Sequence, residues 1–445
     1  MIIPSIDLMG GQTVQLVGGQ EKALDAGDPV PIAERFGLVG ELALIDLDAA
    51  IGTGDNRALV ERVCRVARCR VGGGLRSVAR ATEALDAGAE KIILGTAARP
   101  ELLAKLPKSR LIAALDAKDG KVVVEGWRKE TGDTIAERMR ELRDLVSGFL
   151  VTFVEREGRL QGTDMARVQE LRDAAGDARL TIAGGVTTVE EIAELDKLGV
   201  DAQVGMALYT GRMDLAEAFA APLVSDRADG LFATVVVDEH GRALGQCWSS
   251  RESLTEALRT KTGVYHSRKR GLWRKGASSG ATQALLRVDL DCDRDALRFT
   301  VAQNGPGFCH TGDKTCWGPL GGTPSLAELV RARAADAPPG SYTARLFREP
   351  GLLQAKLVEE AGELARAGTP DEVRAEAADV LYFTLVAMAK AGVSLAEVET
   401  VLDARARKLT RRPGDAKPAP AAPREHTDAS SESPLAPRDR GDRDP

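Results

Sequence analysis

Three cysteines and four alternating aspartates lie close together in residues 289–317, which read DLDCDRDALRFTVAQNGPGFCHTGDKTCW. Thiolates suit a borderline ion such as zinc, whereas carboxylates suit a hard ion such as magnesium. Three protein thiolates leave the fourth position of a tetrahedral zinc ion to water, which distinguishes a hydrolytic site from a structural one. The stretch therefore predicts a metal-dependent hydrolase.

Other metal sites fit this stretch less well. An EF-hand calcium loop needs glycine at its sixth position and glutamate at its twelfth, and registers starting at Asp289 or Asp291 supply neither. A structural zinc site usually has C-x2-C spacing, whereas Cys309 and Cys316 have C-x6-C spacing. A four-ligand site with His310 stays open as an alternative, but this histidine adjoins Cys309 and is better placed as a general base.

A second acidic group lies in the C-terminal part of the chain. Glu360 and Glu363 are three residues apart in an expected helix, and Glu376 and Asp379 have the same spacing in the next one. Residues three apart share a helix face, so two antiparallel helices would bring the four carboxylates together. A solvated acidic face is the alternative, but several unpartnered like charges are unfavourable, which favours a magnesium site.

The N-terminal half contains an internal repeat that pairs two further aspartates. VGGGLRSVARATEALDAGAEKIILGTAA, starting at Val71, aligns with IAGGVTTVEEIAELDKLGVDAQVGMAL, starting at Ile182. IPSIDL aligns with IAALDA at the same offset of about 110 residues, which predicts two half-barrels. Asp7 and Asp116 would then face each other across the barrel mouth, where two carboxylates can act as general acid and base.

Backbone amides after several strands can bind phosphate, with help from helix N-termini. Two such sites on opposite sides of the barrel predict a substrate with a phosphate at each end. The alternative is that the glycines only form tight turns and the aspartates only cap helices. The candidate phosphate-binding positions are Gly74, Thr96, Gly185 and Gly205.

The elements that must position these groups fall into three domains and a tail. Short apolar runs alternate with amphipathic stretches over residues 1–222, which predicts one (β/α)8 TIM barrel. Residues 229–318 predict a small β-rich α+β domain, residues 324–410 an all-α bundle, and residues 411–445 a disordered tail. The expected barrel strands cover residues 2–6, 42–45, 91–94, 111–115, 149–153, 180–183 and 202–205, with helices that include residues 77–87 and 188–197.

Composition narrows the class of protein. The chain has 445 residues, of which 43% are hydrophobic and 28% charged, and its net charge of −6 argues against nucleic-acid binding. No apolar run approaches the roughly 20 residues of a membrane span, and the start lacks the basic region of a secretory signal. Six cysteines in a chain of this length do not form a disulfide framework, so we expect a cytoplasmic protein with no membrane partner.

Residues 1–222 resemble the histidine-biosynthesis barrel that isomerises phosphoribosylformimino-AICAR phosphate in an Amadori rearrangement. The similar motifs are IIPSIDL, VGGGLRS, LGTAA, ALDAKDGKVVVEGW and AGGV. The resemblance implies that Asp7 and Asp116 are catalytic and that Trp127 stacks on the substrate.

The loop after the fifth expected strand departs from that family. It reads FVEREGR, with Arg159 where a catalytic threonine is expected, and with Glu157 and Phe153 where aspartates are expected. Met206 replaces the usual arginine or serine after Gly205. Arginine cannot replace the threonine hydroxyl and adds a bulky charge. An active isomerase and a non-catalytic scaffold or dimerisation module are therefore both open interpretations of the barrel.

Residues 229–318 resemble phosphoribosyl-AMP cyclohydrolase through SRKRGLWRKGASSG, DLDCDRD and CHTGDKTCW. The resemblance implies hydrolytic opening of an adenine ring, with zinc ligands from two subunits and hence a homodimer. Arg268, Arg274 and Lys275 are the candidate phosphate-binding residues of this domain. The implied metal ligands are Cys292, Cys309 and Cys316 for zinc, and Asp291, Asp293 and Asp295 for magnesium.

Residues 324–410 resemble phosphoribosyl-ATP pyrophosphohydrolase, an all-α MazG-like family. KLVEEAGELARA and EVRAEAADVLYF match its EExxE and ExxD signature, which implies magnesium at Glu360, Glu363, Glu376 and Asp379. Together the three resemblances imply a fused histidine-biosynthesis enzyme. It would act on phosphoribosyl nucleotides in three consecutive steps, which run in reverse order along the chain.

Overall fold

The computed structural model describes residues 1–17, 21–118, 121–124, 129–156, 159 and 162–411. Trp127, Glu157 and almost all of the expected tail lie outside the described residues.

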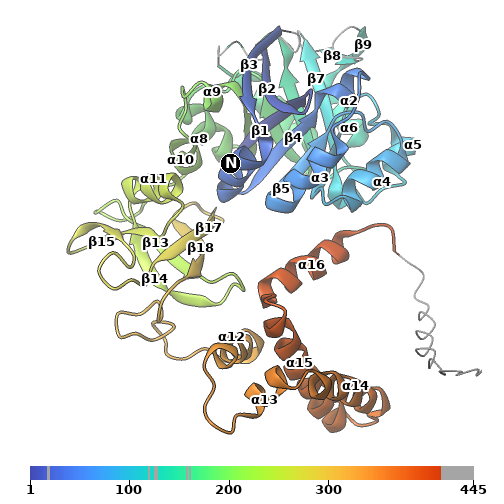
Figure 1. Cartoon of the computed structure of the whole chain (residues 1–445). Coiled ribbons are helices and arrows are strands. Elements are labelled where there is room, and N and C mark those ends of the chain that lie inside the picture. Colours follow the sequence, from blue (N-terminus) through green and yellow to red (C-terminus); the bar gives the residue numbers. More distant parts are fainter. Residues whose placement is uncertain (18–20, 119–120, 125–128, 157–158, 160–161, 412–445) are drawn as a thin grey trace, which may run out of the picture. The chain divides into compact units, whose positions relative to one another are not determined.

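Eight parallel strands form a closed barrel, as the alternating pattern predicts (Figure 1). They run in the order β1-β4-β5-β6-β7-β10-β11-β12, and pairing between β12 and β1 closes the ring. Their bounds are β1 (Ile2–Met9), β4 (Glu41–Asp46), β5 (Arg68–Gly72), β6 (Lys91–Leu94), β7 (Leu111–Lys118), β10 (Gly148–Phe153), β11 (Arg179–Ala183) and β12 (Val200–Val204). The chain therefore contains the expected TIM barrel.

The backbone repeats in the two halves of the barrel. β1 continues into a hairpin of β2 (Gln12–Val17) and β3 (Glu21–Gly27), and β7 continues into β8 (Lys121–Val124) and β9 (Lys129–Thr134). Asp7 pairs with Val14, and Asp116 pairs with Val123, seven residues later in both cases. This equivalence agrees with the half-barrel repeat in the sequence.

Short helices surround the barrel strands (Figure 1). Two lie where the sequence predicts them: α4, after its N-cap Ser77, and α8, whose capping box pairs Thr188 with Glu191. The helices are α1 (Pro29–Phe36), α2 (Leu47–Ile51), α3 (Arg57–Val66), α4 (Val78–Asp86), α5 (Pro100–Leu103), α6 (Ile135–Leu142), α7 (Met165–Ala175), α8 (Val189–Lys197), α9 (Met206–Tyr209) and α10 (Leu215–Ala220).

The barrel interior is layered, and the layers decide which end is open for chemistry. At the N-terminal ends of the strands, Arg70 donates to Glu41 at 2.5 Å and to Thr181 at 3.0 Å. Burial alone would raise the pKa of Glu41, but Arg70 and Lys91 outweigh it and lower the pKa to about 2. Above this charged layer lies an apolar one formed by Ile93, Ile112, Leu150 and Ala183. The N-terminal end is therefore closed, which leaves the C-terminal mouth.

A six-stranded sheet in the order β16-β15-β14-β13-β18-β17 forms the middle domain. Its elements are β13 (Phe232–Val237), β14 (Ala243–Ser249), α11 (Arg251–Thr260), β15 (Val264–Ser267), β16 (Gly271–Arg274), β17 (Gln283–Leu290) and β18 (Ala296–Gln303). The fully buried rings of Tyr265 and Phe299 pack at 5.3 Å between centroids in its core.

Five helices make the C-terminal domain: α12 (Gly322–Ala335), α13 (Tyr342–Arg348), α14 (Pro350–Arg366), α15 (Pro370–Lys390) and α16 (Leu395–Arg407). The buried core is small and consists of Val330, Leu346, Leu353, Phe383 and Val386. Several large apolar side chains are exposed instead, among them Val358, Leu381, Val401 and Leu402. One chain therefore leaves much of the apolar surface of these helices uncovered.

No single helix in the described part of the chain is long and apolar enough to cross a membrane. α15 and α16 satisfy the length and composition test only as a pair, and a bend of 109° separates them.

Candidate active sites

The two barrel aspartates lie on opposite sides of the C-terminal mouth. Asp7 is near the end of β1 and Asp116 near the end of β7, and three strands separate β1 from β7 in either direction around the ring. The half-barrel symmetry therefore places two carboxylates where a substrate in the mouth would lie between them. A general acid and a general base on opposite sides of one substrate can move a proton from one carbon or oxygen atom to another.

Asp7 is set for proton transfer near neutral pH. Burial raises its pKa from 3.8 to about 6, although a hydrogen bond from Ser5 Oγ at 3.1 Å works in the opposite direction. Gln15 Nε2 donates to the second carboxylate oxygen at 3.4 Å. The hydroxyl of Tyr209 donates to the Ser5 carbonyl at 3.1 Å, which fixes the strand beneath the carboxylate.

A hydroxyl stands beside the second aspartate, at a position other than the one the family pattern suggests. Thr152 of β10 is in register with Asp116 of β7, and paired residues of neighbouring strands share a face of the sheet. Phe153 points to the other face and is fully buried in the core. Arg159, at the expected threonine position, is exposed, and its backbone amide donates to Arg156 at 3.2 Å.

The candidate phosphate positions follow their strands as expected. Gly74 (φ +66°) and Gly185 (φ +96°) adopt backbone conformations that favour glycine. A Cβ atom would lie 2.6 Å from Ala49 Cβ at the first position and 2.5 Å from the Gly162 oxygen at the second. Thr96 is exposed after β6, and Gly205 directly precedes α9. Tight packing alone therefore accounts for Gly74 and Gly185, and phosphate binding at the four positions stays a prediction.

Four barrel residues beside the aspartates were missed by sequence reasoning: Ser5, Gln15, Thr152 and Tyr209. The two-residue period of a strand would have placed Ser5 on the face of Asp7, and register with Asp116 would have indicated Thr152. Gln15 and Tyr209 reach the site only through the tertiary fold, so no local pattern identifies them.

The three aspartates of the middle domain converge on the loop between two strands. β17 ends at Leu290, and carboxylate oxygens of Asp291, Asp293 and Asp295 lie within 4.8 Å of one another on the loop after it. Asp291 accepts hydrogen bonds from the backbone amides of Asp295 and Ala296, both at 3.1 Å. This tight loop between β17 and β18 gathers the three carboxylates on one side. Such an oxygen set suits magnesium.

Arg294, inside this loop, has a φ of +68°, which is unusual for a residue with a side chain. Its guanidinium binds Asp196 of α8 at 2.9 and 3.2 Å, and its carbonyl accepts from the amide of Val224 at 2.9 Å. Backbone strain of this kind persists only where surrounding contacts impose it. The bonds from Asp196 and Val224 therefore fix the shape of the aspartate loop.

Two substitutions at this position separate strain from the ion pair. Arg294→Ala and Arg294→Gly both remove the bonds to Asp196, but only glycine adopts positive φ without a steric cost. We expect the alanine variant to be less stable than the glycine variant by about 1 kcal/mol. Urea unfolding of the two variants, followed by the fluorescence of the middle-domain tryptophans, measures the difference, and equal midpoints would contradict the strained loop.

The cysteines fit a zinc site only in part within one chain. Cys309 and Cys316 are adjacent, and hydrogen bonds from Thr311 lower the pKa of the Cys309 thiol. Burial and then Cys309 raise the pKa of the Cys316 thiol. Cys292 lies on the aspartate loop, and none of the candidate metal groups among the described residues includes a cysteine. Two thiols are therefore paired, and the third expected zinc ligand is elsewhere.

The cationic candidates of the middle domain have different surroundings. Arg268 lies over the Trp248 ring at 5.6 Å, and Arg274 is exposed and paired with Glu256. Lys275 is only 8% exposed, and burial lowers its pKa, while the nearby thiols of Cys247, Cys309 and Cys316 act in the opposite direction. Its ammonium donates to the Ala281 carbonyl at 3.3 Å. His310 Nδ1 is 3.7 Å from the Cys309 sulfur. The ammonium of Lys275 is thus placed to compensate thiolate charge, whereas Arg268 and Arg274 lie at the surface.

Two helices of the C-terminal domain bring their carboxylates together as predicted. Glu360 of α14 lies within 4.8 Å of Glu376 and Asp379 of α15, and it also groups with Glu359 and Glu363. Burial, and then Glu363, Glu360 and Asp379, raise the pKa of Glu376. Lys356 binds Glu359 at 3.0 Å and Glu360 at 2.5 Å. This lysine is the cationic partner of the cluster among the described residues, and the oxygen set suits magnesium.

Glu360 is the member of this cluster with the largest expected effect, because it is only 5% exposed and belongs to both groups. Replacing it with glutamine keeps the shape but removes the charge, so we expect magnesium binding to weaken at least about tenfold. Titration calorimetry with magnesium chloride measures this. Glu349→Gln, at an exposed helix end, is the matched control, and equal affinities in the two variants would contradict the site.

Comparisons with known proteins cover nearly all of the three domains. The model for histidine biosynthesis proteins matches residues 1–214, that for phosphoribosyl-AMP cyclohydrolase residues 246–318, and that for phosphoribosyl-ATP pyrophosphohydrolase residues 323–406. These matches confirm the three resemblances that the motifs predict.

Relatives include fusions and a separate barrel protein. A histidine biosynthesis trifunctional protein of Neurospora crassa is 41% identical over 341 residues, which is 75% of this chain and 36% of the relative. A histidine biosynthesis bifunctional protein of Schizosaccharomyces pombe is 52% identical over 206 residues, 46% of this chain and 49% of the relative. The chain thus spans between about a third and a half of these two relatives.

An archaeal relative matches the barrel over almost its entire length. It is the 1-(5-phosphoribosyl)-5-((5-phosphoribosylamino)methylideneamino) imidazole-4-carboxamide isomerase of Methanocaldococcus jannaschii, 36% identical over 231 residues, 49% of this chain and 97% of the relative. The chain therefore belongs to the histidine biosynthesis protein family, with cyclohydrolase and pyrophosphohydrolase domains following its isomerase-like barrel.

Proposed function

We propose that this chain catalyses three consecutive steps of histidine biosynthesis. The C-terminal domain hydrolyses phosphoribosyl-ATP to phosphoribosyl-AMP and pyrophosphate, the middle domain opens the adenine ring of phosphoribosyl-AMP, and the barrel isomerises the product. The observation that supports this most strongly is that the middle and C-terminal domains each gather a set of carboxylates, while the barrel carries Asp7 and Asp116 on opposite sides of its mouth.

In the C-terminal domain, Glu360, Glu363, Glu376 and Asp379 are the proposed magnesium ligands. Magnesium would supply neutralisation of the triphosphate charge when bound. Lys356 has a separate role, because its ammonium already forms ion pairs with Glu360 and Glu359 without the metal. We propose that its ammonium turns to a substrate phosphate once the carboxylates hold a cation.

In the middle domain, Cys292, Cys309 and Cys316 are the proposed zinc ligands, and Asp291, Asp293 and Asp295 the proposed magnesium ligands. Zinc would supply Lewis-acid activation of water when bound. His310, next to Cys309, is the proposed general base, and Arg268 and Arg274 are the proposed contacts of the phosphoribosyl group. The charge of Lys275 favours the thiolate form of Cys316, although burial and Cys309 raise the pKa of that thiol overall.

In the barrel, Asp7 and Asp116 are proposed to move the protons of an Amadori rearrangement, in which an aldose amine becomes a ketose amine. The raised pKa of Asp7 supports this, because a group with a pKa of about 6 both gives and takes protons at neutral pH. Thr152 supplies a hydroxyl beside Asp116, so the lack of a threonine at position 159 does not leave the mouth without one.

The second candidate function for the barrel is a scaffold without chemistry, which Arg159 and the buried Phe153 favour. Incubation of the full chain with the isomerase substrate, phosphoribosylformimino-AICAR phosphate, distinguishes the two. Formation of the ketose product supports the isomerase. If the substrate stays unchanged while the cyclohydrolase and pyrophosphohydrolase activities of the same preparation are present, the scaffold interpretation holds.

We further propose a homodimer in which Cys292 of one copy completes the zinc site at Cys309 and Cys316 of the other. The separation of Cys292 from the other two thiols within one chain supports this, as does the exposed apolar surface of the helical domain. Six free cysteines, three of them proposed zinc ligands, suit the reducing cytoplasm, which is the proposed location.

Mixing two inactive variants tests the shared site. Each zinc site of the proposed dimer takes Cys292 from one copy and Cys309 from the other. In a mixed dimer of Cys292→Ser with Cys309→Ser, both substitutions therefore fall in one site, and the other site keeps all three cysteines. Unfolding the two variants together and refolding them should therefore restore about a quarter of wild-type cyclohydrolase activity. Each variant refolded alone is the control, and no gain in the mixture would place all three ligands in one chain.

A further inference from the structure

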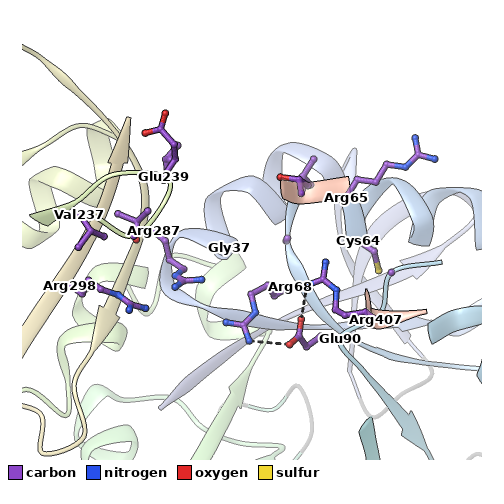
Figure 2. Close-up of a pocket in the computed structure, with 17 residues that line it drawn as sticks. Gly37, Cys64, Arg65, Arg68, Glu90, Val237, Glu239, Arg287, Arg298 and Arg407 are labelled. Carbon is purple, nitrogen blue, oxygen red and sulfur yellow. Dashed lines mark hydrogen bonds and ion pairs between the residues drawn. The ribbon is translucent and has the colours of Figure 1, made fainter. Parts of the chain in front are cut away.

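A cavity of about 530 Å³ lies away from all three proposed active sites (Figure 2). None of the proposed catalytic or metal-binding residues lines it. Its charged lining is dominated by cations, since five arginines but only two glutamates contribute: Arg65, Arg68, Arg287, Arg298 and Arg407, with Glu90 and Glu239.

Two of these arginines share one carboxylate. Glu90 is 3.2 Å from Arg68 and 3.6 Å from Arg407, and Figure 2 shows it between the two side chains. Arg68 also lies 3.6 Å from Glu41, but Glu41 is already bound by Arg70 at 2.5 Å and Lys91 at 2.9 Å. The group formed by Arg68, Glu90 and Arg407 therefore has one positive charge in excess.

Two further arginines share a second carboxylate on neighbouring strands. Arg287 and Asp289 belong to β17 and Arg298 to β18, and the Asp289 carboxylate is 3.0 Å from the first arginine and 2.9 Å from the second. This group also has one positive charge in excess. Figure 2 shows Arg287 and Arg298 extending towards Arg68. Burial lowers the pKa of Arg68, but Glu90, and to a smaller extent Glu41 and Asp289, outweigh it and raise the pKa.

We propose that this cavity binds an anion with at least two negative charges, of the phosphate or pyrophosphate class. Of the other charged lining residues, Arg65 is paired with Glu61 at 2.6 Å. Figure 2 shows the Glu239 carboxylate directed away from Arg287 and Arg298. The two arginine groups therefore present one excess positive charge each, and an anion with two negative charges would balance both. Guanidinium groups donate paired hydrogen bonds that match phosphate oxygens, and the hydroxyl of Thr300 at the lining can donate a further one. Arg407 belongs to α16, so an anion here would join the C-terminal helix to β17, β18 and the barrel.

Calorimetric titration of inorganic pyrophosphate into the full-length chain tests the proposal. The chain is first stripped of metal with a chelator, so that binding through the acidic clusters is suppressed. Arg298→Gln should weaken one class of pyrophosphate binding at least about tenfold, because it removes one guanidinium fork. Arg345→Gln is the matched control, because it also removes the arginine of an exposed ion pair, the one with Glu349, but away from the cavity. This variant should bind pyrophosphate as the wild type does.

Arg407→Gln provides a second variant from the opposite wall and should show the same loss. A parallel titration with ADP distinguishes a site for the phosphates alone from one that also holds a nucleoside. Equal pyrophosphate affinity and stoichiometry in wild type, Arg298→Gln and Arg407→Gln would overturn the proposal. Since the readout is binding without turnover, failure of a proposed activity would not imitate that result.

Discussion

Replacing Asp7 with asparagine is expected to lower the isomerisation rate by roughly 10²–10⁴-fold, the usual contribution of one general acid or base. Asparagine keeps the hydrogen bonds to Ser5 and Gln15 possible but cannot exchange a proton. Asp173→Asn, on the surface of the same barrel, is the control and should retain the full rate. A steady-state assay with purified isomerase substrate measures both variants, and an unchanged rate in Asp7→Asn would exclude Asp7 from the chemistry.

The pH dependence gives an independent test of the same residue. With a pKa of about 6, Asp7 should produce a limb near pH 6 in the profile of kcat/KM. Loss of activity below this pH identifies Asp7 as the base, and loss above it identifies the acid. Ser5→Ala should move the limb to higher pH, since the Ser5 hydrogen bond lowers the pKa of Asp7.

The raised pKa also has a consequence for stability. The folded chain holds the Asp7 proton up to about pH 6, whereas the unfolded chain releases it near the ordinary pKa of 3.8. The free energy of unfolding therefore decreases as the pH rises from 3.8 to about 6, and it is not regained at higher pH. Because part of the residue stays open at the mouth, we expect Asp7→Asn to stabilise the barrel at pH 7 by about 1–2 kcal/mol and by much less at pH 4.

Replacing Cys309 with serine is the second change with a large expected effect. Cyclohydrolase activity should fall more than about 100-fold. Loss of a residue that only hydrogen-bonds to a metal ligand usually costs up to about 100-fold, and loss of the ligand itself should cost more. Zinc content, measured by atomic emission after dialysis, should fall by one ion per site. Cys64→Ser, in α3 of the barrel, is the control. Full zinc retention in Cys309→Ser would show that this thiol is not a ligand.

Features that arise from periodicity and repetition were largely predictable from the sequence. The alternation of apolar and amphipathic stretches indicated the barrel, and the internal repeat placed Asp7 and Asp116 opposite each other. The three-residue spacing on two helices brought Glu360, Glu376 and Asp379 together. These predictions succeed because backbone geometry alone determines which side chains share a face.

Features that depend on local competition were less predictable. Ser253 and Glu256 have the spacing of a capping box, but α11 begins at Arg251 with a capping box of Ser250 and Ser253, because several serines compete for the cap. Ser325 lies within α12, which begins three residues earlier at Gly322. The shape of the loop between β17 and β18 depends on contacts to Asp196 and Val224, which no local pattern indicates.

Local sequence patterns could not predict features that depend on the tertiary or quaternary structure. Thr152 stands beside Asp116 only because β10 pairs with β7 in one register. The burial of Lys275 near the thiols depends on how the sheet of the middle domain folds. Cys292 lies away from Cys309 and Cys316, so the three expected zinc ligands come together only if a second copy of the chain contributes one of them.

If one chain performs the three consecutive reactions, phosphoribosyl-ATP supplied as the sole substrate should pass through all of them. With the purified chain, zinc and magnesium present, chromatography of the products should show pyrophosphate and the isomerised, ring-opened ketose in equal amounts. Asp7→Asn should stop at the ring-opened aldose, and Cys309→Ser should stop at phosphoribosyl-AMP. Accumulation of either intermediate by the wild-type chain, without the ketose, would contradict the proposed three-step function.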